Sequence, residues 1–283
     1  MAIIIDGKAL RDEILDKLSK ETAEFKSKPK LVVILVGDDA ASRIYVNNKQ
    51  KMAQKVGIES VVINLPSSVA EEEVINKIKE LNNDSSVDAI LVQLPLPEHI
   101  NSVNVIEAIS PYKDVDGFSS YNISKIFKGE TPIVYPCTPK GVLNLLDKYN
   151  IPVEGKHAVV IGRSLIVGRP MAQMLINRNA TVTICHSYTK NLEQITKTAD
   201  IIVSAVGKNI IKGEMLNKNL KPVVIDVGIF KDEYGKLRGD VDFDSSSKIA
   251  SYITPVPGGV GPMTIASLML NTVDLYKKFR LNR

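Results

Sequence analysis

Three separated segments of this 283-residue chain carry polar side chains that could bind a nitrogen heterocycle and move its protons. Tyr45 and Lys49 are four residues apart, so on a helix both side chains leave one face about one turn apart. Gln93 ends an apolar run before two prolines, and Asp116 lies in a glycine-containing loop. An ammonium can carry protons, an amide can recognise a heterocycle, and a carboxylate can accept from an amino-pyrimidine. The alternative for the Tyr–Lys pair is an ordinary solvated helix face.

A second group of residues follows an apolar run in the other half of the chain. Gly162 comes directly after that run and Gly168 precedes a helical pattern, which permits a tight turn and lets backbone approach a pyrophosphate at a helix N-terminus. The spacing differs from G-x-G-x-x-G, because Arg163 and Ser164 stand where the middle glycine would be. An ordinary strand-to-helix turn is therefore the alternative.

The next expected strand indicates which dinucleotide would fit. NAD sites tend to place an acid about 20 residues on, to hold the ribose 2′-hydroxyl, whereas residues 186–190 include none. Ser187 can donate to a 2′-phosphate, and Arg163 or Lys190 can neutralise it. The sequence thus favours NADP over NAD. A helix cap is the alternative role of Ser187.

Apolar β-branched runs alternate with helical-period segments along the chain, which predicts an α/β fold with parallel sheets covered on both faces. The expected strands are 31–36, 61–63, 87–92, 158–161, 181–185, 201–206 and 223–227. Helix starts are expected at Ser42, at the capping-box spacing of Ser68 and Glu71, and at Thr138.

The same alternation predicts two α/β domains, the second a Rossmann-type parallel sheet, joined by long helices around a central cleft. Residues 1–139 would form the first domain and residues 140–262 the second. The last helix, within 263–283, would pack back on the first domain.

Composition excludes several classes of protein. With 44% hydrophobic and 24% charged residues, the chain is neither disordered, collagen-like nor coiled coil. A net charge of +4 without blocks of like charge argues against nucleic acid as a partner. The uncharged stretch 263–273 falls short of the ~20 residues of a membrane span. Without an apolar signal core, and with Cys137 and Cys185 as its only cysteines, the chain is expected to be cytoplasmic. The three histidines are scattered, so no metal site is expected.

Taken together, these segments resemble the bifunctional methylenetetrahydrofolate dehydrogenase/methenyltetrahydrofolate cyclohydrolase family. The matching motifs follow family order over nearly the whole chain. They are Ser42-x-x-Tyr45-x-x-x-Lys49, Val92-Gln93-Leu94-Pro95-Leu96-Pro97, Lys113-Asp114-Val115-Asp116-Gly117, Pro136-Cys137-Thr138-Pro139-Lys140-Gly141, Gly162-Arg163-Ser164 to Met171, Asp226-Val227-Gly228-Ile229 and Pro255 to Thr264.

The resemblance implies an activity and roles for the residues of the first half. The family oxidises 5,10-methylenetetrahydrofolate with NADP to 5,10-methenyltetrahydrofolate, then hydrolyses that cation to 10-formyltetrahydrofolate, which supplies purine, methionine and histidine biosynthesis. Lys49 would transfer protons in the cyclohydrolase step, with Tyr45 orienting it. Gln93 would position Lys49 and the folate, and Asp116 would accept from the pterin amino groups.

The resemblance also implies the remaining contacts. The first domain would bind folate and the second NADP, and the protein would be a homodimer. The implied NADP contacts are Gly162, Arg163, Ser164, Ser187 and Ile229; the implied folate contacts are Tyr45, Lys49, Gln93, Asp116, Pro257, Gly258, Gly259 and Thr264. A bent connection before the last helix is the alternative role of the run 255–262.

Two other functions compete with this interpretation. Another two-domain NADP-dependent dehydrogenase, resembling shikimate dehydrogenase, would explain the second half of the chain. It would not explain Tyr45, Lys49, Gln93 and Asp116 together. A non-catalytic NADP-binding module would be expected to have lost Lys49 or Asp116.

Overall fold

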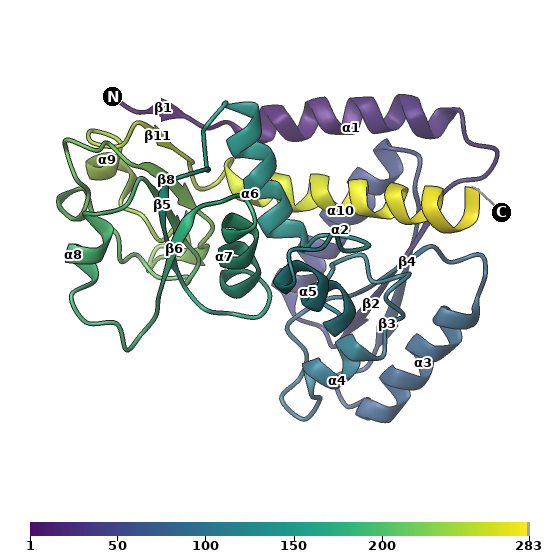
Figure 1. Ribbon diagram of the computed structural model, residues 1–283. Helices are drawn as coiled ribbons and strands as arrows, with labels where there is room; N and C mark the ends of the chain where they lie inside the picture. Colours follow the sequence, from purple (N-terminus) through teal and green to yellow (C-terminus); the bar gives the residue numbers. More distant parts are fainter. Residues whose placement is uncertain (282–283) are drawn as a thin grey trace. The chain divides into compact units, whose positions relative to one another are not determined.

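The computed structural model describes residues 1–281, which form two compact units (Figure 1). One unit comprises Met1–Arg11 and Thr138–Thr264; the other comprises Asp12–Cys137 and the chain from Ile265 onward. Residues 282–283, which belong to the expected C-terminal helical segment, lie outside the described residues.

The unit that contains Asp12–Cys137 is built on a parallel three-stranded sheet of order β3-β2-β4. Its strands are β2 (Lys30–Val36), β3 (Glu59–Leu65) and β4 (Ala89–Val92). Val33 of the central strand pairs with Val62 on one side and Leu91 on the other. Every residue of β2 after Lys30 is buried, as the continuous apolar run predicts.

Alternate side chains of β2 point into two apolar clusters on opposite faces of this sheet. Leu31, Val33 and Leu35 pack with α1 (Gly7–Ala23), α2 (Ala40–Lys55) and α10 (Val260–Tyr276). Val32, Ile34 and Val36 pack with α3 (Glu71–Asn83) and α4 (Ser102–Glu107). Figure 1 shows the purple α1 running beside the yellow α10. A further helix, α5 (Ser120–Phe127), follows the loop after α4, and a π-helical segment, Lys277–Leu281, follows α10.

The other unit is built on a parallel six-stranded sheet of order β1-β11-β8-β7-β5-β6. Its strands are β1 (Ile3–Ile4), β5 (His157–Ile161), β6 (Thr181–Cys185), β7 (Ile201–Ser204), β8 (Val223–Asp226) and β11 (Tyr252–Ile253). From β5 the chain adds β6 on one side and then β7 on the other, so the strand order reverses at β5. Such a reversal is where open α/β sheets bind their ligands.

Short elements complete this unit around an apolar core to which strands β5–β8 and β11 and the segments between them contribute. They are α6 (Cys137–Lys148), α7 (Gly168–Ile176), α8 (Leu192–Thr196), a 3₁₀ turn (Gly213–Met215), the hairpin of β9 (Phe230–Lys231) and β10 (Leu237–Arg238), and α9 (Phe243–Ser246). The predicted α/β class and the Rossmann-type sheet are confirmed. Among residues 1–281, no helix combines the length and apolar character needed to cross a bilayer.

The structure differs from the expected grouping of residues 1–139 at the N-terminus. Ile3 and Ile4 pair in parallel with Tyr252 and Ile253, so the first eleven residues belong to the six-stranded unit. The Ile5 N–H also donates to the Ile253 carbonyl at 2.8 Å. A two-residue edge strand has no periodicity of its own, and only its pairing partner identifies it.

Three expected helix starts are also displaced. The cap of α2 is Asp39, whose carboxylate accepts from the Ser42 N–H at 2.7 Å, so Ser42 lies inside the first turn. Helix α3 begins at Glu71 after Ala70, which makes no side-chain cap, and the capping box expected from Ser68 does not form. Helix α6 begins at Cys137, one residue before the expected cap.

Candidate active site

A hydrogen bond joins the two segments that the sequence predicts to work together. Lys49 lies in α2 and Gln93 directly follows β4; the lysine Nζ donates to the glutamine Oε1 at 2.9 Å. The Gln93 amide nitrogen donates to the Leu94 carbonyl at 2.6 Å, which fixes the orientation of the amide. Both side chains are half-buried. The ammonium is therefore held in place by an acceptor that is itself held by backbone.

Tyr45 precedes Lys49 by one turn of α2 and is 45% exposed. The cap by Asp39 sets the start of this helix, and the buried Val46 fixes which face turns toward the sheet. An exposed phenol ring beside an ordered ammonium offers a flat apolar surface with one polar tip.

The loop after α4 contains two acids that do different things. Asp114 is 1% exposed, and its carboxylate accepts from the N–H groups of Gly117 and Ser119 at 3.0 and 2.8 Å and from the Asn122 amide at 3.0 Å. Gly117 has φ +73°, and a Cβ there would lie 2.9 Å from the Pro136 nitrogen. Asp114 therefore shapes the loop, and its oxygens are already occupied.

Asp116 is the second acid of the loop and is half-buried. Burial raises the pKa of its carboxyl above the ordinary value, and the charge of Asp114 adds to that rise. The nearby Lys49 ammonium and a hydrogen bond from the Cys137 thiol lower the same pKa. The structure thus brings Lys49, Gln93 and Asp116 together, with the lysine in contact with the amide and electrostatically coupled to the acid.

A residue that sequence reasoning missed holds both sides of this loop. Asn271, in α10, is fully buried, and its amide nitrogen donates to the carbonyls of Val115 and Tyr135 at 2.8 and 2.9 Å. The same nitrogen lies 3.5 Å from the Cys137 sulfur. Its only signal in the sequence is an amide within the largely apolar stretch 265–275, where a buried polar group requires partners.

The turn after β5 is as tight as its glycines predict. Gly162 has φ +118°, and a Cβ there would lie 2.6 Å from the Ala205 carbonyl oxygen. A Cβ on Gly168 would lie 2.3 Å from the Gly162 carbonyl oxygen. The Ser164 hydroxyl accepts from the N–H groups of Val167 and Gly168 at 3.2 and 3.3 Å, just where α7 begins. Such a turn at a helix N-terminus fits a pyrophosphate.

The carboxyl end of β6 lies beside this turn. Ser187 and Lys190 are exposed there, and the Arg163 guanidinium stands 5.8 Å from the centre of the Tyr188 ring. No carboxylate occurs at 186–190. Ile229 lies three residues after the end of β8 and is 44% exposed. The residues present therefore fit a dinucleotide, as an NAD(P)-binding domain requires.

The proline–glycine run belongs to the same unit as this turn, whereas Lys49, Gln93 and Asp116 belong to the other. Gly258 has φ +115°, and its carbonyl accepts from the Lys8 N–H at 3.0 Å. A Cβ on Gly259 would lie 2.7 Å from the Pro255 carbonyl oxygen. Pro257 is exposed, and the Thr264 hydroxyl lies 3.0 Å from that of Thr138. The run 255–262 thus forms the expected bent connection before α10, and contact of these residues with a ligand stays a prediction.

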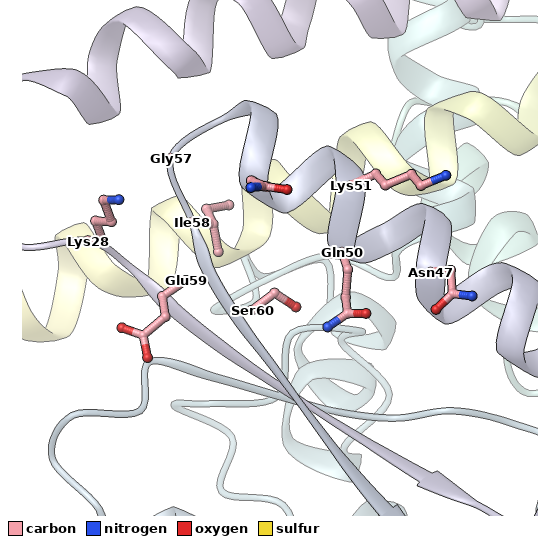
Figure 2. Close-up of a pocket in the computed structure, with 9 residues that line it drawn as sticks. Lys28, Asn47, Gln50, Lys51, Gly57, Ile58, Glu59 and Ser60 are labelled. Atoms are coloured by element: carbon pink, nitrogen blue, oxygen red, sulfur yellow. The ribbon is translucent and has the colours of Figure 1, made fainter.

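A polar cavity of about 650 Å³ lies between α2 and β3 (Figure 2). Its lining includes Asn47, Gln50 and Lys51 from α2, and Glu59 and Ser60 from β3. Tyr45 and Lys49 are not among the lining residues, so this hollow is distinct from the Lys49–Gln93 pair.

Two family models match the chain along most of its length. Residues 5–116 match the catalytic domain of tetrahydrofolate dehydrogenase/cyclohydrolase, and residues 136–280 match its NAD(P)-binding domain. The chain belongs to the tetrahydrofolate dehydrogenase/cyclohydrolase family. As a member, it is a bifunctional dehydrogenase and cyclohydrolase of folate one-carbon metabolism, with an NAD(P)-binding domain.

Full-length relatives agree with this family. The chain is 53% identical to the bifunctional protein FolD of Ligilactobacillus salivarius over 98% of each chain. The crystal structure of the FolD dehydrogenase/cyclohydrolase from Campylobacter jejuni superposes with a TM-score of 0.96 at 47% identity, over 98% of this chain and 99% of that one. The Trypanosoma brucei enzyme, complexed with NADP and an inhibitor, gives 0.93 at 37% identity over 98% of each chain. The family match sets aside a shikimate-dehydrogenase-like enzyme.

The two acids of the loop should separate by experiment. Asp116→Ala should raise the KM for the folate substrate about 10- to 100-fold in both the dehydrogenase and cyclohydrolase assays, since an ionic hydrogen bond contributes roughly 1.5–3 kcal/mol. Asp114→Ala should instead lower the free energy of unfolding by about 2–4 kcal/mol, because it strands three donors. Steady-state kinetics and urea denaturation of both variants measure this. An Asp116→Ala enzyme with parental kcat/KM in both assays would show that the wrong carboxylate was chosen.

Proposed function

We propose that the chain oxidises 5,10-methylenetetrahydrofolate with NADP and hydrolyses the resulting 5,10-methenyltetrahydrofolate to 10-formyltetrahydrofolate, with Lys49 as the proton-transfer group. The observation that carries this proposal is the 2.9 Å hydrogen bond from Lys49 to Gln93. Asp116 is close enough for the Lys49 charge to lower the pKa of its carboxyl. An ordered ammonium between an amide and a carboxylate suits a cationic heterocycle that must gain and lose protons.

Hydrolysis of the methenyl cation needs three proton movements. Water adds to the methenyl carbon and loses a proton. The bond from that carbon to N5 then breaks while N5 gains a proton and the hydroxyl on the carbon loses its proton to solvent, which leaves the formyl group on N10. Lys49 in its amine form takes the proton from the adding water and, as the ammonium, returns it to N5. Gln93 keeps the Lys49 nitrogen at the reacting carbon, and Tyr45 orients it from one turn away.

Recognition of the folate falls to the same cluster. Asp116 accepts from the pterin amino groups, and the exposed ring of Tyr45 lies against the planar substrate. Pro257, Gly258, Gly259 and Thr264 are proposed as further ligand contacts, as the family resemblance implies, with Pro257 exposed and no side chain on the two residues after it. The folate-binding domain is proposed to be the unit built on the three-stranded sheet, and the NADP-binding domain the unit built on the six-stranded sheet, to which the first eleven residues also belong.

NADP, when bound, supplies the hydride acceptor of the dehydrogenase reaction. Gly162 and Ser164 form the turn for its pyrophosphate, and Ile229 offers an apolar surface to its nicotinamide. Arg163 and Ser187 bind the 2′-phosphate, and the absence of an acid at 186–190 supports this choice over NAD. Hydride transfer asks the protein only to orient the methylene carbon toward the acceptor.

The protein is also proposed to act as a cytoplasmic homodimer. Strand β3 is an edge of its three-stranded sheet, so one side of its main chain has no strand partner within the described residues. Such an edge can be covered by another copy of the chain.

The Lys49 assignment separates the two chemistries. Lys49→Gln keeps length and polarity but removes the exchangeable charge, so cyclohydrolase activity should fall about 10²- to 10⁴-fold while dehydrogenase activity remains measurable. Methenyltetrahydrofolate should then accumulate. NADPH formation and methenyl absorbance are followed in parallel on the purified variant. Cyclohydrolase activity within a few fold of the parent would make Lys49 a binding residue only.

The cofactor assignment depends on Arg163. Because its guanidinium would pair only with the 2′-phosphate, Arg163→Ala should raise the KM for NADP about 10- to 100-fold and leave that for NAD nearly unchanged. Initial rates with each cofactor at saturating folate measure the effect, with Arg169→Ala as the matched control on the same turn. A parent enzyme with equal kcat/KM for NADP and NAD would contradict the assignment.

The raised pKa of Asp116 predicts how folate binding depends on pH. A carboxyl binds amino groups best when it is ionised. Because the pKa of Asp116 is raised, the carboxyl becomes protonated, and the folate KM should rise, at a higher pH than the value of about 4 that is usual for an aspartate. Affinity is thus full above the raised pKa and is lost below it. In Asp116→Asn this acid limb should disappear from a plot of KM against pH. A limb unchanged in the variant would assign it to another group.

A further inference from the structure

Three donors from the last residue of β7 and the segment after it converge on one buried carboxylate. Asp240 is 0% exposed; its Oδ2 accepts from the Val206 N–H at 2.7 Å and from the Ser204 hydroxyl at 2.9 Å. Its Oδ1 accepts from the Lys208 N–H at 2.9 Å. Among the described residues 1–281 Asp240 forms no ion pair, so its carboxylate acts on this segment through hydrogen bonds from two backbone N–H groups and one hydroxyl.

A second buried acid fixes the backbone of the first. Asp226 ends β8, and its two oxygens accept from the N–H groups of Asp240 and Val241, each at 2.9 Å. Burial raises the pKa of Asp226 to about 7; the charge of Asp240 adds to the rise, and the backbone N–H groups oppose it. Placing two acids here is costly, and neither belongs to the proposed catalytic residues.

Two glycines let these carboxylates lie directly against backbone. A Cβ on Gly228 would stand 1.8 Å from the Asp240 Oδ1, and one on Gly239 would stand 2.0 Å from the Asp226 Oδ2. On the other side, Gly162 of the phosphate turn packs against the Ala205 carbonyl, where a Cβ would be 2.6 Å away. Contacts therefore run without a gap from the turn after β5 through 205–208 to Asp240 and on to the loop after β8.

These two loops stand at the carboxyl ends of β7 and β8, on the side of β5 opposite to β6. A doubly wound sheet binds one mononucleotide half of a dinucleotide on each side of the reversal point. The β5–β6 side carries Arg163 and Ser187, which suit the phosphorylated adenosine. The β7–β8 side carries the exposed apolar side chains of Val206 and Ile229, at 37% and 44%, which suit a nicotinamide.

We propose that Asp240 is the positioning residue of the nicotinamide half of the dinucleotide site, acting through the backbone of 205–208 and 227–229. It acts on the ligand only through these loops. The proposal rests on the proposed NADP-dependent function for the identity of the cofactor. It predicts that the two halves of the cofactor respond differently when Asp240 changes.

The test compares NADP with adenosine 2′,5′-bisphosphate, which occupies only the adenosine side. In Asp240→Asn the new NH₂ group cannot accept, so one of the two acceptor atoms is lost and at least one loop N–H faces a donor instead. The KM for NADP should rise about 10-fold or more, while the Ki of the bisphosphate stays within about 2-fold of the parent. Cyclohydrolase activity on methenyltetrahydrofolate, measured without cofactor, should also stay within about 2-fold.

A control variant separates positioning from general loosening of the unit. Asp242 lies two residues on and caps α9 by accepting from the Ser245 N–H at 2.9 Å; within residues 1–281 it makes no hydrogen bond with 204–208. Asp242→Ala should lower the thermal midpoint yet keep the parental KM for NADP. If Asp242→Ala raises that KM as much as Asp240→Asn, or if Asp240→Asn weakens NADP and the bisphosphate equally, the proposal is overturned.

A milder variant decides the matter if Asp240→Asn does not fold. Ser204→Ala removes a single donor to Asp240, and the KM for NADP should rise about 3-fold with the bisphosphate Ki unchanged. A parental KM in Ser204→Ala overturns the proposal. A parent enzyme that prefers NAD would instead refute the cofactor assignment, and the same comparison with NAD and adenosine 5′-monophosphate would still test Asp240.

Discussion

Parallel pairing of neighbouring strands determines where the functional side chains of this protein can lie. In the three-stranded and the six-stranded sheet all strands run the same way, so their carboxyl ends meet at one edge, and the loops that leave that edge are neighbours. Gln93 follows β4 at such an edge, and Gly162, Ser187 and Ile229 follow strands of the other sheet. The apolar faces of the strands supply the stability, and the polar side chains at their ends are placed as a result.

Buried polar residues then give these loops definite shapes. Asp114, Asn271 and Asp240 each accept from or donate to backbone groups of a loop that bears site residues. Each is buried, where an unmatched partner costs about 1–3 kcal/mol. A few buried hydrogen bonds therefore hold these loops in place. Because the loops do not depend on broad apolar packing, the site residues on them can remain partly exposed to ligands.

Much of this arrangement could be predicted from the sequence. The features that could not be predicted mostly depend on contacts between residues far apart in the chain. Buried strands such as 31–36 are fully apolar on both faces, so composition alone identifies them, and spacing places Tyr45 and Lys49 on one helix face. The positions of β1 and Asn271 depend on partners more than a hundred residues away, which no local pattern encodes. The expected cap of α2 at Ser42 is wrong: Asp39 is the cap. Both residue types suit that position, and only the geometry of the turn distinguishes them.

The bonds made by Asn271 also order events in time as the chain is made. Val115 and Tyr135 precede Asn271 by 156 and 136 residues, so the loop that carries Asp116 lacks these two restraints until α10 has been synthesised. At a synthesis rate of about 5–20 residues per second, that interval is on the order of ten seconds. A nascent chain that has not yet reached α10 therefore carries the Asp116 loop without the hydrogen bonds that fix its two sides.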